Sequence, residues 1–220
     1  MSKSIIIVGP AYPLRGGLAT YNQLLATKLQ EQGHSVRIVT FSLQYPNILF
    51  PGKTQYSTDI KPENIEIEVS LNSVNPLNWL SLGNTLRKEK PDLVIFRYWM
   101  PFMGPSLGTL GRIIRKNKHT KVVTIADNII PHEKRFFDTP FTKYFVNSCD
   151  GFITMSESVL EDLKQFDSTK PVAYNPHPMY ESFGPQLDKA DARKKLGLAE
   201  NGKYLLFFGF IRKYKGLDIL

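Results

Sequence analysis

The chain has 220 residues, of which 42% are hydrophobic and 22% charged, a composition that excludes disordered and collagen-like proteins. Its single cysteine, Cys149, excludes an internal disulfide framework and a cysteine zinc cluster. No apolar run reaches the roughly 20 residues that span a bilayer, and the first run lacks signal-peptide features, so we expect a soluble, cytoplasmic protein. The net charge of +8 favours a polyanionic partner, namely an anionic membrane, a phosphorylated substrate or nucleic acid.

The first 40 residues predict one strand–helix–strand unit. Residues 4–9 (SIIIVG) form a short, mostly β-branched run that is typical of a strand buried on both faces of a parallel sheet. Residues 16–32 repeat apolar side chains at helical spacing, and Gly33 stands where a C-cap glycine is expected. Residues 35–40 (SVRIVT) predict the next strand.

The same alternation continues to about residue 175. A long loop rich in Pro, Gly, Asn and Gln is predicted at 41–62. Further strands are predicted at 65–69, 92–96, 121–125, 151–154 and 172–174. Further helices are predicted at 77–88, 106–117, 141–147 and 156–165, the last with Ser156 as its N-cap. This spacing predicts an α/β fold with a Rossmann-like, open and mostly parallel sheet flanked by helices.

The chain after this sheet predicts a change of domain. Residues 176–200 begin with a proline-rich stretch and contain one short predicted helix at 190–196, which is typical of an interdomain linker. Residues 204–209 (YLLFFG) predict a new strand, and a helix is expected from residue 217. Because one strand and four helical residues cannot bury a core, we expect residues 1–175 to form the first domain and 201–220 the truncated start of a second, also Rossmann-like, domain.

Three segments resemble the family-4 glycosyltransferases of the GT-B fold. The opening IIIVGPAYPLRGGLATYNQLLATKLQEQGHSVRIVT resembles their first strand–helix–strand unit. ITMSES resembles a strand-to-helix step late in their N-terminal domain, and FFGFIRKYKGLDIL resembles the start of their C-terminal domain. The order and spacing of the three segments agree with that family.

The resemblance implies a function. Family members transfer a sugar, as hexosyltransferases do, from a nucleotide-diphosphate sugar to an acceptor with retention of configuration, usually without a bound metal. Residues 1–175 would then be the acceptor-binding half and 201–220 the beginning of the donor-binding half. The resemblance implies a glycan or lipid-linked acceptor, a role such as polysaccharide biosynthesis, no cofactor other than the donor substrate, and no activity for this chain alone.

The loop after the first strand carries Arg15, Gly16 and Gly17. Glycines at this point let the backbone approach a ligand, and the following helix start offers N–H groups and partial positive charge. The resemblance implies that this loop faces the donor phosphates or the acceptor. A tight turn without a ligand is the alternative, and Arg15 is then a solvated loop charge.

Two basic residues of the closing segment, Arg212 and Lys215, resemble the pair that grips the donor diphosphate in the family. A guanidinium and an ammonium can neutralise the departing diphosphate where no metal is bound. Arg212 is offset, because the position directly after the strand-ending glycine is Phe210 here. The alternative is an ordinary basic loop at a helix start.

The segment TIADNIIPHEKR follows a predicted buried strand, where ligand loops of α/β sheets lie. The resemblance implies a histidine at the end of this strand, but Ala126 occupies that position. The candidate catalytic residues are therefore Asp127, which can orient an acceptor hydroxyl or accept its proton, and His132, an acid–base or phosphate-binding candidate. A turn cap and a surface histidine are the alternatives. His177, in the NPHP sequence, is interpreted as part of a structural hinge.

The basic residues of 111–121 suggest a surface that contacts anionic membrane, since a helix with cationic and apolar faces can lie on lipid. An ordinary sheet-covering helix is the preferred alternative. No nucleic-acid-binding motif accompanies the charge, so no nucleic-acid partner is expected. Two other functions stay open: a non-hydrolysing nucleotide-sugar epimerase of GT-B architecture, and a non-catalytic module that binds phosphate or membrane.

Overall fold

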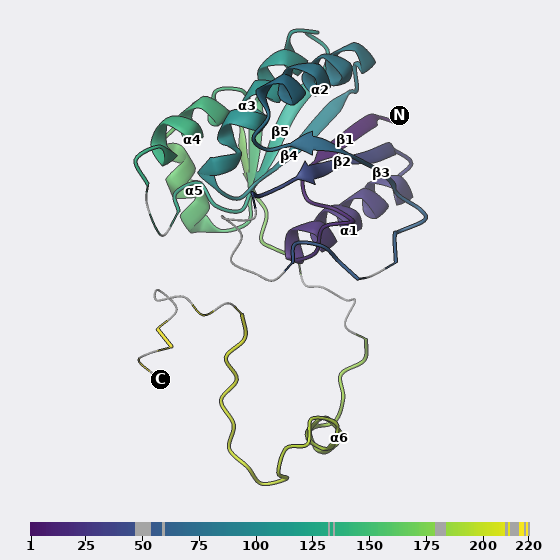
Figure 1. Cartoon of the computed structure of the whole chain (residues 1–220), viewed down its shortest axis with the longest axis vertical. Coiled ribbons are helices and arrows are strands. Elements are labelled where there is room, and N and C mark those ends of the chain that lie inside the picture. Colours follow the sequence, from purple (N-terminus) through teal and green to yellow (C-terminus); the bar gives the residue numbers. More distant parts are fainter. Residues whose placement is uncertain are drawn as a thin grey trace. The chain divides into compact units, whose positions relative to one another are not determined.

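The computed structural model describes residues 1–46, 54–58, 60–131, 133, 135–178, 184–209, 211, 216, 217 and 219. The chain divides into two compact units, Met1–His177 and Pro178–Leu220. The first unit contains a sheet with helices on both faces (Figure 1). Within the second unit, the described residues include one short helix, α6 (Lys189–Lys195).

The sheet has seven strands, and every neighbouring pair is parallel. The strands are β1 (Ser4–Val8), β2 (Ser35–Leu43), β3 (Glu66–Asn72), β4 (Leu93–Tyr98), β5 (Lys121–Ala126), β6 (Gly151–Thr154) and β7 (Val172–Tyr174). Their order is β3-β2-β1-β4-β5-β6-β7, which confirms the predicted Rossmann-like, open sheet. The direction of winding reverses between β1 and β4, and such a switch point opens a crevice at the carboxyl ends of the strands.

Helix α1 covers one face of the sheet, and α2 to α5 cover the other (Figure 1). The helices are α1 (Gly17–Glu31), α2 (Pro76–Glu89), α3 (Gly104–Arg115), α4 (Asp138–Val146) and α5 (Glu157–Lys164), with a short 3-10 turn, η2 (Pro101–Met103), before α3. Strand β1 is buried on both faces, because Ile5 and Ile7 pack in the core beneath α1 while Ile6 and Val8 pack in the core beneath the other helices. The apolar run predicts this double burial.

Two helix ends are as the sequence predicts. Gly33 has φ +85°, and its N–H donates to the carbonyl of Gln30 (2.8 Å) where α1 ends. Ser156 is the N-cap of α5, and its Oγ accepts the N–H of Val159 (3.3 Å). Both ends satisfy backbone groups that a helix terminus otherwise leaves without a partner.

Other boundaries differ from the prediction. Strand β2 extends to Leu43, through residues predicted as loop, because Phe41 is buried in the core. Helix α4 begins three residues earlier than predicted, at Asp138, whose carboxylate accepts the N–H of Arg135 (2.6 Å) in the preceding turn. The predicted loop 41–62 lies partly outside the described residues, and its described part includes an isolated antiparallel bridge between Leu14 and Tyr56.

The strand predicted at 204–209 is wrong, since these residues form neither strand nor helix. Leu205, Leu206 and Phe208 are about nine-tenths exposed. A single strand needs a neighbour for its backbone hydrogen bonds, and no described residue after Tyr174 belongs to the sheet. The helix predicted from residue 217 lies largely outside the described residues. Among the described helices, none is long and apolar enough to cross a membrane.

Candidate functional site

A buried ion pair lies at the carboxyl ends of β4 and β5, next to the switch point of the sheet. Arg97, in β4, is 2% exposed, and Asp127 directly follows β5. The Nε of Arg97 donates to Oδ2 of Asp127 (2.6 Å), and its Nη2 donates to the other carboxylate oxygen. The backbone N–H of Asp127 donates to the carbonyl of Tyr98 (2.8 Å). The pair is therefore bidentate and rigidly connected to two neighbouring strands.

The loop after β1 packs closely against this arginine. A Cβ at Gly9 would lie 2.7 Å from Cβ of Arg97 and 2.7 Å from Nδ2 of Asn22, so only glycine fits there. Asn22, which is fully buried in α1, donates from Nδ2 to the carbonyl of Pro10 (2.8 Å). The end of β1, the start of α1 and the end of β4 thus form one tightly packed corner.

Tyr21 and His177 complete the cluster. The Cζ atom of Arg97 lies 4.0 Å from the centroid of the Tyr21 ring, a cation–π contact. The His177 ring lies edge-on to the same ring, with 5.4 Å between centroids. His177 is thus not only part of a connecting segment, as its flanking prolines suggest, but a neighbour of the Arg97–Asp127 pair.

The electrostatics of Asp127 combine opposing effects. The pKa of its carboxyl group is raised above the ordinary value, because burial outweighs the charge and hydrogen bonds of Arg97 and the proximity of His177, which act to lower it. Nη1 of Arg97 and Oδ1 of Asn22 are buried, and neither has a hydrogen-bond partner among the described residues. The corner therefore retains donor and acceptor capacity that its own side chains do not use.

The predicted glycine loop borders a small hollow. Gly16 has φ +112°, a left-handed backbone that favours glycine, and it precedes α1 without a side-chain cap. The cavity measures about 200 Å³, and Arg15, Gly16, Thr20 and Ser57 are among the residues that line it. No acidic residue lies in the first turn of α1, so the partial positive charge of the helix start is not offset there.

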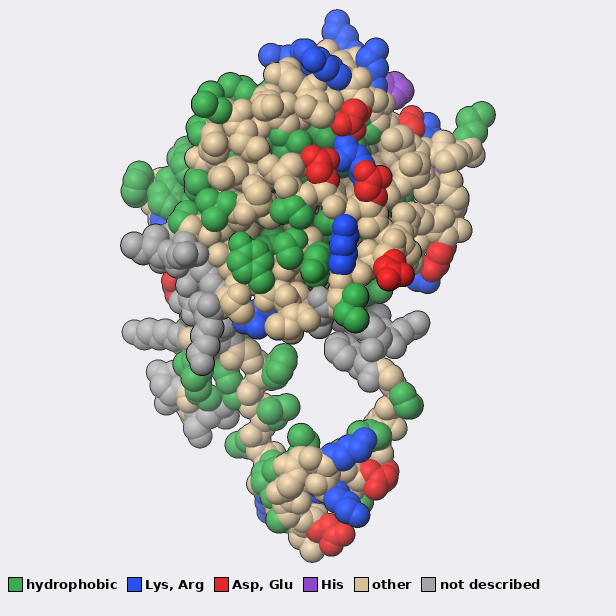
Figure 2. Space-filling view, turned by 45° about the vertical axis from the view of Figure 1, so that its right-hand side comes forward, with side chains coloured by type: hydrophobic (Ala, Val, Ile, Leu, Met, Phe, Trp, Pro, Cys, Tyr) green, Lys and Arg blue, Asp and Glu red, His purple; other side chains and the backbone are tan. Residues whose placement is uncertain are grey.

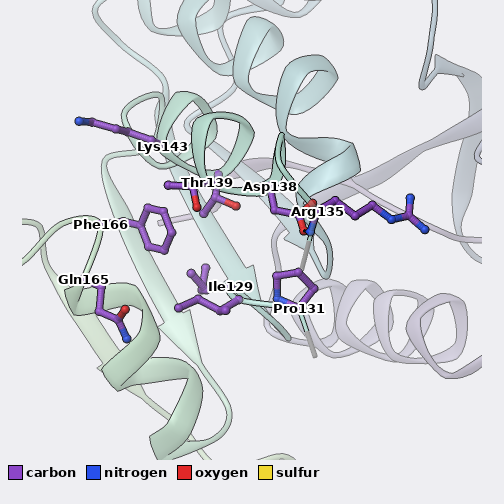
Figure 3. Close-up of a pocket in the computed structure, with 10 residues that line it drawn as sticks. Ile129, Pro131, Arg135, Asp138, Thr139, Lys143, Gln165 and Phe166 are labelled. Atoms are coloured by element: carbon purple, nitrogen blue, oxygen red, sulfur yellow. The ribbon is translucent and has the colours of Figure 1, made fainter. Parts of the chain in front are cut away.

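A larger cavity of about 400 Å³ lies on the other side of the β5 end, between the segment after Asp127, α4 and the end of α5 (Figure 3). Ile129, Thr139 and Phe166 surround it, whereas the charged ends of Arg135 and Lys143 point away from it (Figure 3). This cavity combines apolar and hydroxyl groups with the side chains of Asp138 and Gln165.

Helix α3 does not present the cationic and apolar faces to solvent that the membrane hypothesis requires. It packs between α2 and α4, and eight of its residues are buried. Arg112 donates from Nη2 to the carbonyl of Tyr144 (2.6 Å), and Arg115 pairs with Asp150 (2.9 Å). Helix α3 therefore packs as a sheet-covering helix, and membrane contact by this region stays a prediction. Figure 2 shows a group of Lys and Arg side chains at the upper end of the first unit, with others scattered over the rest of that face. The exposed cations at the ends of α2 and α3 are Lys88, Lys90, Arg115, Lys116, Lys118 and Lys121.

The predicted site residues fall into three groups. Arg15 and Gly16 line the small hollow, with Gly17 as the first residue of α1, and Asp127 lies in the buried pair. His132, Arg212 and Lys215 lie outside the described residues. In the part of the chain that the structure describes, no group of three or more His, Cys, Asp or Glu residues is placed to hold a metal ion.

Sequence reasoning missed Arg97 and Asn22. The signal for Arg97 is a charged residue inside an otherwise apolar strand, DLVIFRY, because a lone charge in a buried strand needs a partner. Nothing in the spacing of α1 distinguishes Asn22 from a solvated polar residue.

Comparisons with known proteins give the family from a family model and the fold from solved structures. The model of Glycosyltransferase Family 4 matches residues 15–178. An alpha-glucosyltransferase in complex with UDP-glucose and DNA containing an abasic site superposes with a TM-score of 0.52 at 14% identity, over 81% of this chain and 44% of that one. The catalytic domain of Starch Synthase IV from Arabidopsis thaliana, bound to ADP and acarbose, gives 0.55 at 10% identity, over 92% and 61%.

A third solved structure, described as a UDP-N-acetylglucosamine 2-epimerase from Listeria monocytogenes, gives a TM-score of 0.50 at 14% identity, over 78% of this chain and 45% of that one. At such identities the likeness shows the fold alone. The chain spans about 44% to 61% of the length of these structures. A search of curated proteins found no match.

Proposed function

The chain belongs to glycosyltransferase family 4, and we propose that it is the acceptor-side part of a hexosyltransferase that moves a sugar from a nucleotide-diphosphate donor to a hydroxyl acceptor with retention of configuration. The observation that carries this proposal is the bidentate Arg97–Asp127 pair at the carboxyl edge of the sheet, beside the switch point where ligands of such sheets bind. The GT-B fold supports it.

In the proposed reaction, the acceptor hydroxyl attacks from the same face that the diphosphate leaves. Asp127 accepts a hydrogen bond from that hydroxyl, and the loop of Arg15, Gly16 and Gly17 lies against the acceptor or the donor phosphates. His132 is proposed as a second acid–base or phosphate-binding group. Donor and acceptor supply all the reacting groups, and no cofactor or bound metal is proposed.

The donor half is proposed to begin near residue 201, after a linker at 176–200 and an acceptor-binding domain at 1–175. In that arrangement Arg212 and Lys215 neutralise the departing diphosphate. The chain alone is then inactive, because most of the donor site is contributed by further residues.

We also propose that the enzyme acts on a glycan or lipid-linked acceptor and contacts the cytoplasmic face of an anionic membrane peripherally. Two observations support this contact: the exposed lysines Lys116, Lys118 and Lys121, and Phe136, which is 95% exposed next to Arg135. Cations attract anionic lipid, and exposed aromatic rings suit the interface between headgroups and acyl chains.

The test is an assay of the complete enzyme with a panel of nucleotide sugars and acceptors, in which mass spectrometry follows the product and NMR assigns its anomeric configuration. Acceptor-dependent release of a nucleoside diphosphate with a retained product is expected. The epimerase alternative shares the fold but has no support from the family match, and it requires isomerised sugar in the absence of acceptor. Sugar transfer by the 220-residue chain alone would overturn the proposed division into two halves.

A further inference from the structure

We infer that Arg97 is a positioning residue, which holds the Asp127 carboxylate as an ionised hydrogen-bond acceptor for the hydroxyl of the acceptor substrate and not as its general base. This inference rests on the proposed function, because it assigns one of the two roles that the sequence leaves open for Asp127. It is carried by the geometry of the pair.

The exposure of the two side chains differs in the direction that this role requires. The Arg97 side chain is 2% exposed, whereas the Asp127 side chain is 20% exposed. A substrate that reaches the carboxyl edge of the sheet therefore meets the carboxylate and not the guanidinium. Arg97 acts only through Asp127, from beneath it.

Bidentate pairing sets the chemical character of the carboxylate. Both oxygens of Asp127 accept a hydrogen bond from Arg97, and each keeps a further lone pair for a hydroxyl donor. A guanidinium remains charged at any physiological pH and favours the ionised carboxylate, which lowers its affinity for a proton. A carboxylate held in this way accepts hydrogen bonds well and is a weaker base than the same buried carboxylate would be without the arginine.

Neighbouring elements fix the guanidinium and contribute the other titratable groups. The ring of Tyr21, from α1, packs on Arg97, and Gly9 leaves room for the arginine stem at the end of β1. His177, after β7, is the other titratable group near Asp127 among the described residues. Burial raises the pKa of Asp127 above its ordinary value, and the charge and hydrogen bonds of Arg97 limit that rise.

The first experiment measures the pair without any activity. The 220-residue chain, labelled with carboxyl ¹³C-aspartate, is titrated by NMR as wild type, Arg97→Met, Arg97→Lys and Arg37→Met. Arg37 is a matched control, because it is another arginine of the sheet that is paired with carboxylates, in β2. We expect the pKa of Asp127 to rise by about 1–3 units in Arg97→Met, by less in Arg97→Lys, and to stay unchanged in Arg37→Met.

The second experiment uses the complete enzyme and the pH profile of kcat/KM. In Arg97→Lys we expect the acidic limb to move to higher pH together with the measured Asp127 titration, a change that a purely structural role does not produce. Asp127→Asn keeps a carbonyl acceptor, so we expect a loss of about 10- to 30-fold in kcat/KM. A loss of about 10³-fold or more would instead identify Asp127 as the base.

The outcomes distinguish failure of the proposed function from failure of the role assigned to Arg97. If wild-type enzyme transfers no sugar, both the proposed function and this role are overturned. If wild-type enzyme transfers sugar but neither Arg97 variant shifts the Asp127 titration or the profile, only the role of Arg97 is overturned. If Arg97→Met fails to fold, Arg97→Lys, which retains the charge but loses the bidentate geometry, decides the question.

Discussion

Gly9 and Arg97 approach so closely that a single methyl group at position 9 would lie 2.7 Å from Cβ of the arginine. Gly9 directly follows β1, and Arg97 lies in β4. These neighbouring strands are the ones between which the winding of the sheet reverses. The glycine that ends the first strand therefore has a packing function distinct from that of the glycine pair further along the loop.

Replacing Gly9 with alanine tests this packing. The new Cβ meets the arginine stem and the Asn22 amide, so we expect a loss of about 1–3 kcal/mol in the free energy of unfolding, measured by urea denaturation. Gly17→Ala is the matched control, because no atom lies within 4 Å of a Cβ there, and it should leave stability within about 0.5 kcal/mol or raise it. Equal stability of the two variants would contradict the close approach.

The sheet could be predicted from sequence because its determinants are local. An apolar run such as SIIIVG is a strand wherever it is buried on both sides, and Ser156 caps α5 by a hydrogen bond to a residue three positions on. The Arg97–Asp127 pair depends instead on register. Arg97 lies opposite Ile125, which places Asp127 on the same face one pleat further along, and no local pattern specifies that alignment.

The apolar run at 204–209 also shows that local sequence alone does not determine a strand. Its composition favours a strand, but strand formation needs a partner, and none of the described residues supplies one. Asn22 could not be predicted as buried for a different reason. Its amide donates to the carbonyl of Pro10 in the preceding loop, and the spacing of apolar residues in the helix does not reveal that contact.

Asp167 gives a prediction about pH. Burial acts to raise its pKa, but hydrogen bonds from Thr169 and Lys170 outweigh it and hold the pKa well below the usual range. A depressed pKa means that the stabilisation is present above the unfolded-state pKa near 4 and is lost as the pH falls through the folded-state pKa. We expect Asp167→Ala to cost about 1–3 kcal/mol at pH 7, and the difference from wild type to shrink below about pH 4.

The control for this pH effect is Glu161→Ala. Glu161 pairs with Lys164, but its side chain is 66% exposed, so its removal should cost less than about 0.5 kcal/mol at any pH. Urea denaturation of both variants across pH 2.5 to 7 measures the difference. A penalty for Asp167→Ala that is the same at both ends of this range would show that its hydrogen bonds are not charge-dependent.

Cys149 gives a prediction about reactivity. Its side chain is fully buried, its Sγ lies 3.2 Å from Oγ1 of Thr124, and burial raises the pKa of the thiol to about 11. Since the thiolate is the reactive form, the native chain should react with Ellman's reagent at pH 8 at least about 100-fold more slowly than the chain in urea. Rapid, stoichiometric labelling of the folded chain would show that the end of α4 opens readily.

The proposed membrane contact predicts which lysines matter. Arg112 and Arg115 are paired within the chain, so we expect the attraction to anionic lipid to come mainly from Lys116, Lys118 and Lys121, which are exposed and lie between the end of α3 and the first residue of β5. Each lysine near an anionic surface contributes about 1 kcal/mol, so replacing all three with glutamine should weaken sedimentation with phosphatidylserine-containing vesicles by about 100-fold. The matched control replaces Lys28 and Lys164, which pair with Glu31 and Glu161. Equal binding by the triple variant and wild type would show that the membrane contact lies on another surface. Binding that persists in 0.5 M salt would show that the contact is not electrostatic.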